Sequence, residues 1–147
     1  MAVKPIPDGY HTVTPYLTVQ GAAKLIDFLK QAFDAQEIER MLQPDGTIRH
    51  AEVRIGDSVV MMTDSQGERK PMPSGIYLYV TDTDAVYERA LQAGAVSMME
   101  PADQFYGDRS AGVQDPCGNQ WWIATHKEDV PLEELKKRAE AAMNQQH

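Results

Sequence analysis

The sequence has little of what a nucleic-acid-binding, membrane-spanning or disulfide-bonded protein requires. It has one cysteine, Cys117, in 147 residues, so no disulfide can form within the chain and no second thiol can join it in a metal site. Its 14 lysines and arginines stand against 22 acidic residues, a net charge of −8, whereas nucleic-acid binding requires basic surfaces. No apolar run approaches the roughly 18 residues of a membrane-spanning helix. We therefore expect neither nucleic acid nor membrane as a partner.

The same scarcity of cysteine bears on the compartment. Residues 1–10 show no apolar segment behind a basic start, so no signal peptide is predicted. One free thiol together with eight methionines suits a reducing environment, and we expect a cytoplasmic protein. The negative charge is compatible with a cationic ligand, although solubility alone is its more ordinary explanation.

What the chain does contain is a globular, 42% hydrophobic sequence in which one order of elements occurs twice. In the first half, an extended run at 10–19 precedes an amphipathic helix at 21–33 and strands at 35–42, 48–55 and 58–63. A polar linker with glycine and prolines covers 65–74. In the second half, a strand at 76–80 and a helix at 83–93 precede a strand at 95–99, a loop at 100–106 and a hairpin of 110–114 with 120–125.

Aligned residues support an internal repeat. Tyr77-Leu78-x-Val80 follows Tyr16-Leu17-x-Val19 by 61 residues, and Trp122 follows Met61 by the same interval. The chain thus divides into two βαβββ modules, at about 10–64 and 75–126, in a single domain.

A last helix is predicted at about 131–143, with Asp129 as its N-cap and Pro131 in its first turn. Its narrow apolar stripe either packs on its own domain or forms a dimer contact, and the sequence favours neither; the stripe is Leu132, Leu135, Ala139 and Ala142.

The closing hairpin carries a family resemblance. Residues 107–125 read GDRSAGVQDPCGNQWWIAT, with a turn at 115–119. Together with the doubled module, this segment resembles the vicinal-oxygen-chelate superfamily of glyoxalase I, bleomycin-resistance proteins and extradiol dioxygenases, and most of all its PhnB-like branch. The resemblance implies an α+β fold in which two βαβββ modules form an open, mixed-sheet half-barrel, followed by the C-terminal helix. It also implies a homodimer.

Metal-dependent members of that superfamily take His, Glu or Gln ligands from the first and last strand of each module. The corresponding positions here hold Thr14, Met61, Gly75 and Trp122. Glycine and tryptophan offer no side-chain ligand, and methionine suits only soft metals. We therefore expect no cofactor and no metal at the usual site.

A different polar group lies on the strand at 48–55, where His50, Glu52 and Arg54 share the face opposite the helix-packing one. His50 and Glu52 supply two metal ligands where at least three are needed, so a divalent metal is disfavoured. Arg54 would repel a cation, and it favours either an ion pair with Glu52 or recognition of an anionic group.

The face that would line a cavity is aromatic and sulfur-containing, while the opposite face already supplies apolar residues to the helices. Two apolar faces predict a sheltered ligand pocket, and the segment 105–109 could form its lid. The predicted ligand-binding residues are Tyr16, His50, Glu52, Arg54, Met61, Tyr77, Tyr79, Tyr106 and Trp122.

The leading functional hypothesis is a protein that binds a small, partly planar ligand in this aromatic cavity without the usual metal. The alternative is a glyoxalase- or dioxygenase-type enzyme, a lyase or isomerase, that uses atypical metal ligands or His50 and Glu52 as a metal-free acid–base pair. A third alternative is a scaffold with no ligand.

Overall fold

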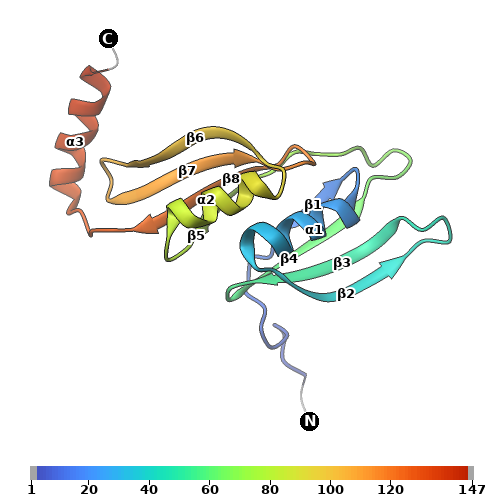
Figure 1. Cartoon of the computed structure of the whole chain (residues 1–147). Coiled ribbons are helices and arrows are strands. Elements are labelled where there is room, and N and C mark those ends of the chain that lie inside the picture. Colours follow the sequence, from blue (N-terminus) through green and yellow to red (C-terminus); the bar gives the residue numbers. More distant parts are fainter. Residues whose placement is uncertain (1–2, 146–147) are drawn as a thin grey trace.

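The computed structural model describes residues 3–145, which form two βαβββ modules and a C-terminal helix (Figure 1). The first module contains β1 (Tyr16–Val19), α1 (Ala22–Phe33), β2 (Gln36–Leu42), β3 (Ile48–Ile55) and β4 (Ser58–Asp64). The second contains β5 (Gly75–Tyr79), α2 (Thr83–Gln92), β6 (Val96–Asp103), β7 (Asp108–Gln114) and β8 (Gln120–His126), and α3 (Leu132–Asn144) follows.

Each module forms its own four-stranded mixed sheet. The strand orders are β1-β4-β3-β2 and β5-β8-β7-β6, and the first and last strands of each module pair in parallel. Tyr16 pairs with Met61, and Tyr77 pairs with Trp122 in the equivalent register, which confirms the repeat. The predicted α+β fold with two open mixed sheets is therefore confirmed.

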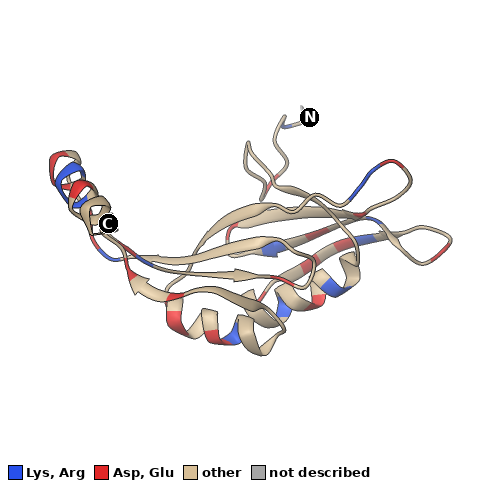
Figure 2. Cartoon of the chain, turned by 90° about the horizontal axis from the view of Figure 1, so that it is seen from above, with Lys and Arg blue, Asp and Glu red and all other residues tan. Residues whose placement is uncertain are grey.

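The helices α1 and α2 lie on the same side of the two sheets and pack against each other (Figure 2). The apolar stripe of α1 is fully buried, including Leu25, Ile26 and Leu29, and each such side chain stabilises the fold by about 1.5–3 kcal/mol. The carboxylate of Asp64 at the end of β4 accepts hydrogen bonds from the backbone N–H groups of Gly21 and Ala22, and so satisfies the first turn of α1.

The opposite faces of both sheets are only partly covered. Tyr16, Tyr77 and Tyr79 are 48%, 43% and 63% exposed. The two sheets lie side by side, and α1 and α2 occupy the junction on one side only (Figure 1). On the other side, the N-terminal segment covers part of the first sheet, where Tyr10 donates to Glu52 and Gly9 lies against Arg54.

Helix α3 extends away from the sheets (Figures 1 and 2), and none of its described residues is buried. Its predicted bounds are confirmed, but the predicted cap is wrong. The N-cap residue is Pro131, whose side chain makes no cap hydrogen bond. The carboxylate of Asp129, the predicted cap, accepts a hydrogen bond from His126 instead. No helix within residues 3–145 combines the length and the apolar character that crossing a membrane would demand.

Two predicted element bounds are also wrong, both at prolines. The strand predicted at 10–19 begins only at Tyr16, after Pro15, because the preceding residues form a turn in which Tyr10 N–H donates to the carbonyl of Pro7. Conversely, β6 continues through Pro101 to Asp103, where a loop was predicted. This is tolerated because β6 is an edge strand, with a register shift around Pro101, where a missing N–H breaks no ladder bond.

Candidate functional site

The open face of the first module carries a hydrogen-bonded group centred on Glu52. His50 Nε2 lies 2.8 Å from Oε2 of this carboxylate, and the hydroxyl of Tyr10 donates to its Oε1. The hydroxyl of Tyr16 lies 3.4 Å from Nδ1 of His50. Glu52 is only 6% exposed, although its partners are not buried. The structure thus confirms that His50 and Glu52 are neighbours and adds Tyr10, which no strand periodicity could place beside them.

Glu52 is held in its charged form. Burial by itself disfavours ionisation, but the hydrogen bonds from Tyr10 and His50 outweigh it and keep the pKa of the Glu52 carboxyl below its ordinary value. An ionised carboxylate oriented toward His50 can fix the imidazole for acid–base chemistry or serve as a metal ligand.

The predicted ion pair between Glu52 and Arg54 is not found among the ion pairs of residues 3–145. Arg54 packs instead against Gly9, where an added Cβ would meet Nη2 at 2.8 Å. The residue that the sequence reasoning missed is Glu39, which stands directly opposite Glu52 in the β2–β3 ladder. Its carboxylate oxygen is 3.7 Å from His50 Nε2. The strand register was the signal that could have found it.

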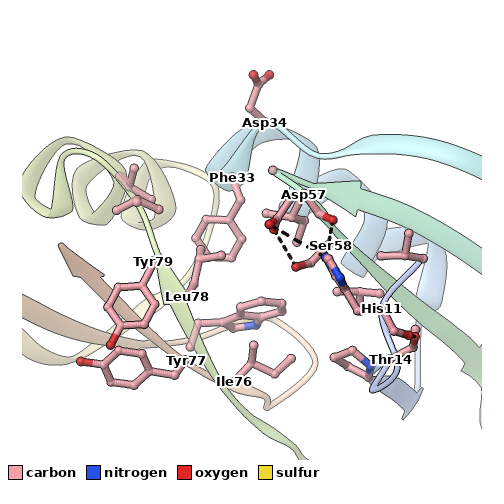
Figure 3. Close-up of a pocket in the computed structure, with 18 of the residues that line it drawn as sticks. His11, Thr14, Phe33, Asp34, Asp57, Ser58, Ile76, Tyr77, Leu78 and Tyr79 are labelled. Atoms are coloured by element: carbon pink, nitrogen blue, oxygen red, sulfur yellow. Dashed lines mark hydrogen bonds and ion pairs between the residues drawn. The ribbon is translucent and has the colours of Figure 1, made fainter. Parts of the chain in front are cut away.

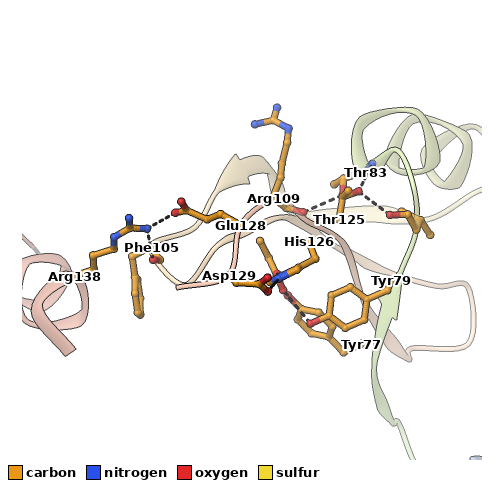
Figure 4. A network of polar contacts seen from close by, with 12 residues as sticks. Tyr77, Tyr79, Thr83, Phe105, Arg109, Thr125, His126, Glu128, Asp129 and Arg138 are labelled. Carbon is orange, nitrogen blue, oxygen red and sulfur yellow. Dashed lines mark hydrogen bonds and ion pairs between the residues drawn. The ribbon is translucent and has the colours of Figure 1, made fainter. Parts of the chain in front are cut away.

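The open face of the second module has its own buried carboxylate, Asp108, whose partners Tyr77, Tyr79 and His126 are labelled in Figure 4. It accepts hydrogen bonds from the hydroxyls of Tyr77 at 2.8 Å and Tyr79 at 3.1 Å, and His126 Nδ1 lies 2.8 Å from it. Burial opposes ionisation of Asp108, yet these three contacts outweigh it and hold the pKa of the carboxyl below its ordinary value. The hydrogen bond to Asp108, followed by a second one to Asp129, raises the pKa of His126.

A pocket of about 300 Å³ lies on the second module and is connected to this carboxylate through Tyr77, which lines the pocket and donates to Asp108. Its lining residues are Tyr77, Met99, Gln104, Tyr106, Ser110 and Trp122. The ring of Trp122 lies directly over Gly112, where an added Cβ would be 2.5 Å from Cζ3. Burial, followed by the hydrogen bond to Asp108, holds the pKa of Tyr77 far above its ordinary value, so its hydroxyl remains a donor.

The predicted lid at 105–109 is only partly a loop. Asp108 and Arg109 open β7, and Arg109 does not pair with Asp108. Its guanidinium forms ion pairs with Asp84 at 2.7 Å and Asp103 at 3.2 Å. These contacts join Arg109 to α2 and β6. Of the predicted lid, only residues 105–107 lie outside the strands.

The nine predicted ligand-binding residues therefore fall into two groups. Tyr16, His50, Glu52 and Met61 lie in the first module with Arg54 nearby, and the second module holds Tyr77, Tyr79, Tyr106 and Trp122. A larger pocket of about 570 Å³ lies at the junction of the two modules, and Phe33 and Trp121 are among its lining residues. Figure 3 shows Tyr77 and Tyr79 on one side of this pocket and His11 and Thr14 on the other. Its lining is predominantly apolar, so this pocket could enclose a ligand but offers few groups that could react with one.

The four positions that hold metal ligands in metal-dependent relatives do not fit a divalent ion here. The Thr14 hydroxyl donates to the carbonyl of His11, Gly75 has no side chain, and Met61 and Trp122 offer a thioether and an indole. The thiol of Cys117 offers no nucleophile either, because burial and then the nearby Asp115 raise its pKa to about 11.

Comparisons with known proteins agree with this architecture. The profile of the Glyoxalase/Bleomycin resistance protein/Dioxygenase superfamily matches residues 10–123. The uncharacterized protein Mb0911c of Mycobacterium bovis is 38% identical over 145 residues, covering 91% of this chain and 93% of its own length. The uncharacterized protein Rv0887c of Mycobacterium tuberculosis is equally similar, over 83% of its length.

Among solved structures, TioX from Micromonospora sp. ML1 superimposes with a TM-score of 0.68 at 24% identity, covering 79% of this chain and 98% of TioX. A PhnB protein from Bacillus cereus, described as a putative 3-demethylubiquinone-9 3-methyltransferase, gives a TM-score of 0.61 at 16% identity, covering 78% and 99%. At these identities the structural matches speak for the fold alone. With the profile match and the doubled βαβββ modules, the chain belongs to the glyoxalase/bleomycin resistance protein/dioxygenase superfamily.

Proposed function

We propose that this protein binds a small, partly planar, positively charged organic molecule, without a metal at the four positions that metal-dependent relatives use. The observation that carries the proposal is the pocket of the second module, which is lined by Tyr77, Tyr106 and Trp122, with the hydroxyl of Tyr77 bonded to the buried Asp108 carboxylate. Its volume of about 300 Å³ is at the lower end of ligand pockets. Aromatic faces attract both planar groups and cations, and the net charge of −8 draws cations toward the protein.

We also infer that two copies pair through their open sheets, and that the protein works in the cytoplasm. The exposed tyrosines on both open faces support pairing, because a contiguous apolar face normally marks an interaction surface. In such a pair, the Glu52 group of one copy could face the Trp122 pocket of the other. The single cysteine supports a reducing compartment.

The test is direct binding of fluorescent dyes, followed by anisotropy. The cationic planar dye proflavine should bind saturably, and the anionic dye fluorescein should bind more weakly. Trp122→Ala should weaken proflavine binding by about 1–3 kcal/mol, the scale of an aromatic anchor in an interface. If fluorescein binds better than proflavine, the cationic-ligand proposal is wrong.

Charge and aromatic contact can be separated with a matched pair of variants. Asp108→Asn and Asp45→Asn each remove one negative charge, but Asp45 lies in an exposed turn away from the pocket. Only Asp108→Asn should weaken proflavine binding, while a neutral planar compound such as 9-methylanthracene should bind both variants equally. Equal loss in the two variants would mean that the dye responds only to net charge.

The contact between His50 and Glu52 favours a second candidate, an enzyme of the lyase or isomerase type. A carboxylate 2.8 Å from one imidazole nitrogen orients the ring and strengthens it as a base. Turnover of an α-hydroxy-carbonyl substrate that is lost in His50→Gln would establish this candidate over simple binding.

A further inference from the structure

We propose that Glu39, His50 and Glu52 form a binding site for one divalent metal ion on the open face of the first module. Each residue presents one ligand atom, and these three atoms all lie within 4.8 Å of one another. Three protein ligands with an open position for water are the arrangement of catalytic zinc sites. One imidazole nitrogen and two carboxylate oxygens suit a borderline ion such as Zn²⁺, and the two carboxylates balance its charge.

This site differs from the one that metal-dependent relatives use. Its ligands come from the edge strand β2 and the neighbouring inner strand β3 of one sheet. The metal-dependent relatives instead use the first and last strand of both modules. The expectation of no metal rested on a count of two ligands, His50 and Glu52. Glu39 raises that count to three, because the register of the β2–β3 hairpin places it directly opposite Glu52.

The pairing of Glu39 with Glu52 is itself an observation that points to a cation. Like charges directly opposite each other on adjacent strands destabilise a sheet. Here one of the two side chains is also 92% buried, since that of Glu52 is 8% exposed. His50 Nε2 lies 2.8 Å from Glu52 and 3.7 Å from Glu39, so it points between the two carboxylates. A divalent ion in this space would balance the charge of both carboxylates at once.

Two tyrosines hold the ligands from behind. The hydroxyl of Tyr10 donates to Oε1 of Glu52, which leaves Oε2 directed toward His50. The hydroxyl of Tyr16 lies 3.4 Å from Nδ1 of His50, so that Nε2 is the free ligand atom when Nδ1 carries the proton. Hydrogen bonds of this kind to the non-ligating atoms are what orient metal ligands in proteins.

Space for the open coordination position is present. The side chains of Glu39 and His50 are 49% and 20% exposed, so the site opens to solvent on their side. A separate pocket of about 360 Å³, lined by Tyr10, Met61 and residues 5–7, reaches Glu52 but not the other two ligands. Arg54, the cation whose presence argued against a metal, makes no ion pair with Glu52 and packs against Gly9. An ion at this site would therefore be accessible to water or to a small ligand.

The experiment uses the full chain, stripped with EDTA, dialysed and titrated with ZnCl₂ alone in a calorimeter. One equivalent of Zn²⁺ should bind per chain. Glu39→Gln should weaken the affinity at least about 100-fold, because changes outside the ligand shell already cost 10–100-fold. Glu39 is the decisive position, since its side chain is 49% exposed and the substitution leaves the buried part of the sheet unchanged. Tyr10→Phe should cost about tenfold through the orientation of Glu52.

The chain offers a matched control in His126→Gln. His126 also contacts two carboxylates, Asp108 and Asp129, but through its two different ring nitrogens, so the three groups cannot meet on one ion. This variant should bind Zn²⁺ as the wild type does. Absence of saturable binding at one equivalent, unchanged affinity in Glu39→Gln, or loss of binding in His126→Gln would each overturn the proposal.

Discussion

Trp121 Nε1 donates a 2.8 Å hydrogen bond to Oδ2 of Asp115, and both residues are almost completely buried. The same carboxylate accepts from the backbone N–H groups of Cys117 and Asn119 and from the side-chain amide of Asn119. One aspartate thus satisfies both the turn between β7 and β8 and the largest side chain of the core. The turn that characterises this sequence is therefore part of the hydrophobic core.

Asp115→Ala should lower the free energy of unfolding by at least about 2 kcal/mol, because it leaves the indole N–H and the turn amides buried without an acceptor. Urea denaturation measures the change. Asp45→Ala is the matched control, since Asp45 also accepts from residues of its own turn, but in an exposed position. It should cost no more than about 1 kcal/mol. Equal losses would mean that burial of the Asp115 network contributes nothing.

A second prediction concerns Gly112, which lies under the ring of Trp122. Its backbone does not require glycine, but an added Cβ would be 2.5 Å from the indole. Gly112→Ala should therefore displace Trp122, shift the tryptophan emission spectrum, weaken ligand binding and cost about 1–3 kcal/mol of stability.

Gly75→Ala is the control for that prediction. Gly75 pairs with β8 as Gly112 does, but nothing lies within 4 Å of an added Cβ. We expect its stability to change by less than about 0.5 kcal/mol and its emission spectrum to match the wild type. If both variants behave alike, Trp122 is not held by close packing on β7.

The fold could be predicted from the sequence because its signals are local. Apolar periodicity located α1, α2 and all eight strands. The 61-residue offset between Met61 and Trp122 predicted the equivalent registers found in the two sheets. Local signals failed at Pro15 and Pro101, although β1 and β6 are both edge strands. The strand β1 begins after Pro15, whereas β6 continues through Pro101 at a shift in its register with β7. Periodicity assigns a residue to a face, and it carries no information about which neighbouring strand needs the N–H.

The candidate site was only partly predictable, because its contacts cross between strands and segments. His50 and Glu52 were found together since they are two residues apart on one strand. Tyr10 reaches Glu52 from 42 residues away, and Glu39 requires the hairpin register. Asp108 and Arg109 are neighbours in sequence but do not share partners, because successive residues of a strand point to opposite faces.

The pH dependence of stability follows from His126. Hydrogen bonds to Asp108 and then Asp129 raise its pKa above the ordinary value of 6.5. A raised pKa means that the protonated imidazole stabilises the folded chain. This contribution is fully present below about pH 6.5 and is lost as the pH rises through the folded-state value.

Nuclear magnetic resonance titration of the imidazole measures this shift directly, and urea denaturation between about pH 5.5 and 9 measures its effect on stability. Asp129→Asn should lower the pKa of His126 by removing one of the two negative charges that stabilise the protonated imidazole. His126→Gln should flatten the difference between low and high pH. A midpoint at or below 6.5 in the wild type would contradict the assigned contacts.

The last prediction is that the protein is a dimer at micromolar concentration, paired through its open sheet faces. Met41 tests this because it pairs with His50 on the open face of β2–β3 and is 51% exposed. Met41→Lys should dissociate the dimer, which sedimentation velocity would detect as a fall toward the 16.4 kDa monomer. Lysine is chosen because Glu39 lies nearby, so the new charge does not strain the fold.

Two exposed methionines elsewhere provide the comparison. Met72 lies in the linker and is 69% exposed, so Met72→Lys should leave the dimer intact because a lone exposed apolar side chain marks no interface. Met143 lies on α3 and is 60% exposed, and Met143→Lys distinguishes the two surfaces that could mediate pairing. A dimer that survives Met41→Lys but dissociates in Met143→Lys would assign the interface to α3. The open sheets would then face the ligand directly, and the Glu52 group and the Trp122 pocket would act as separate sites.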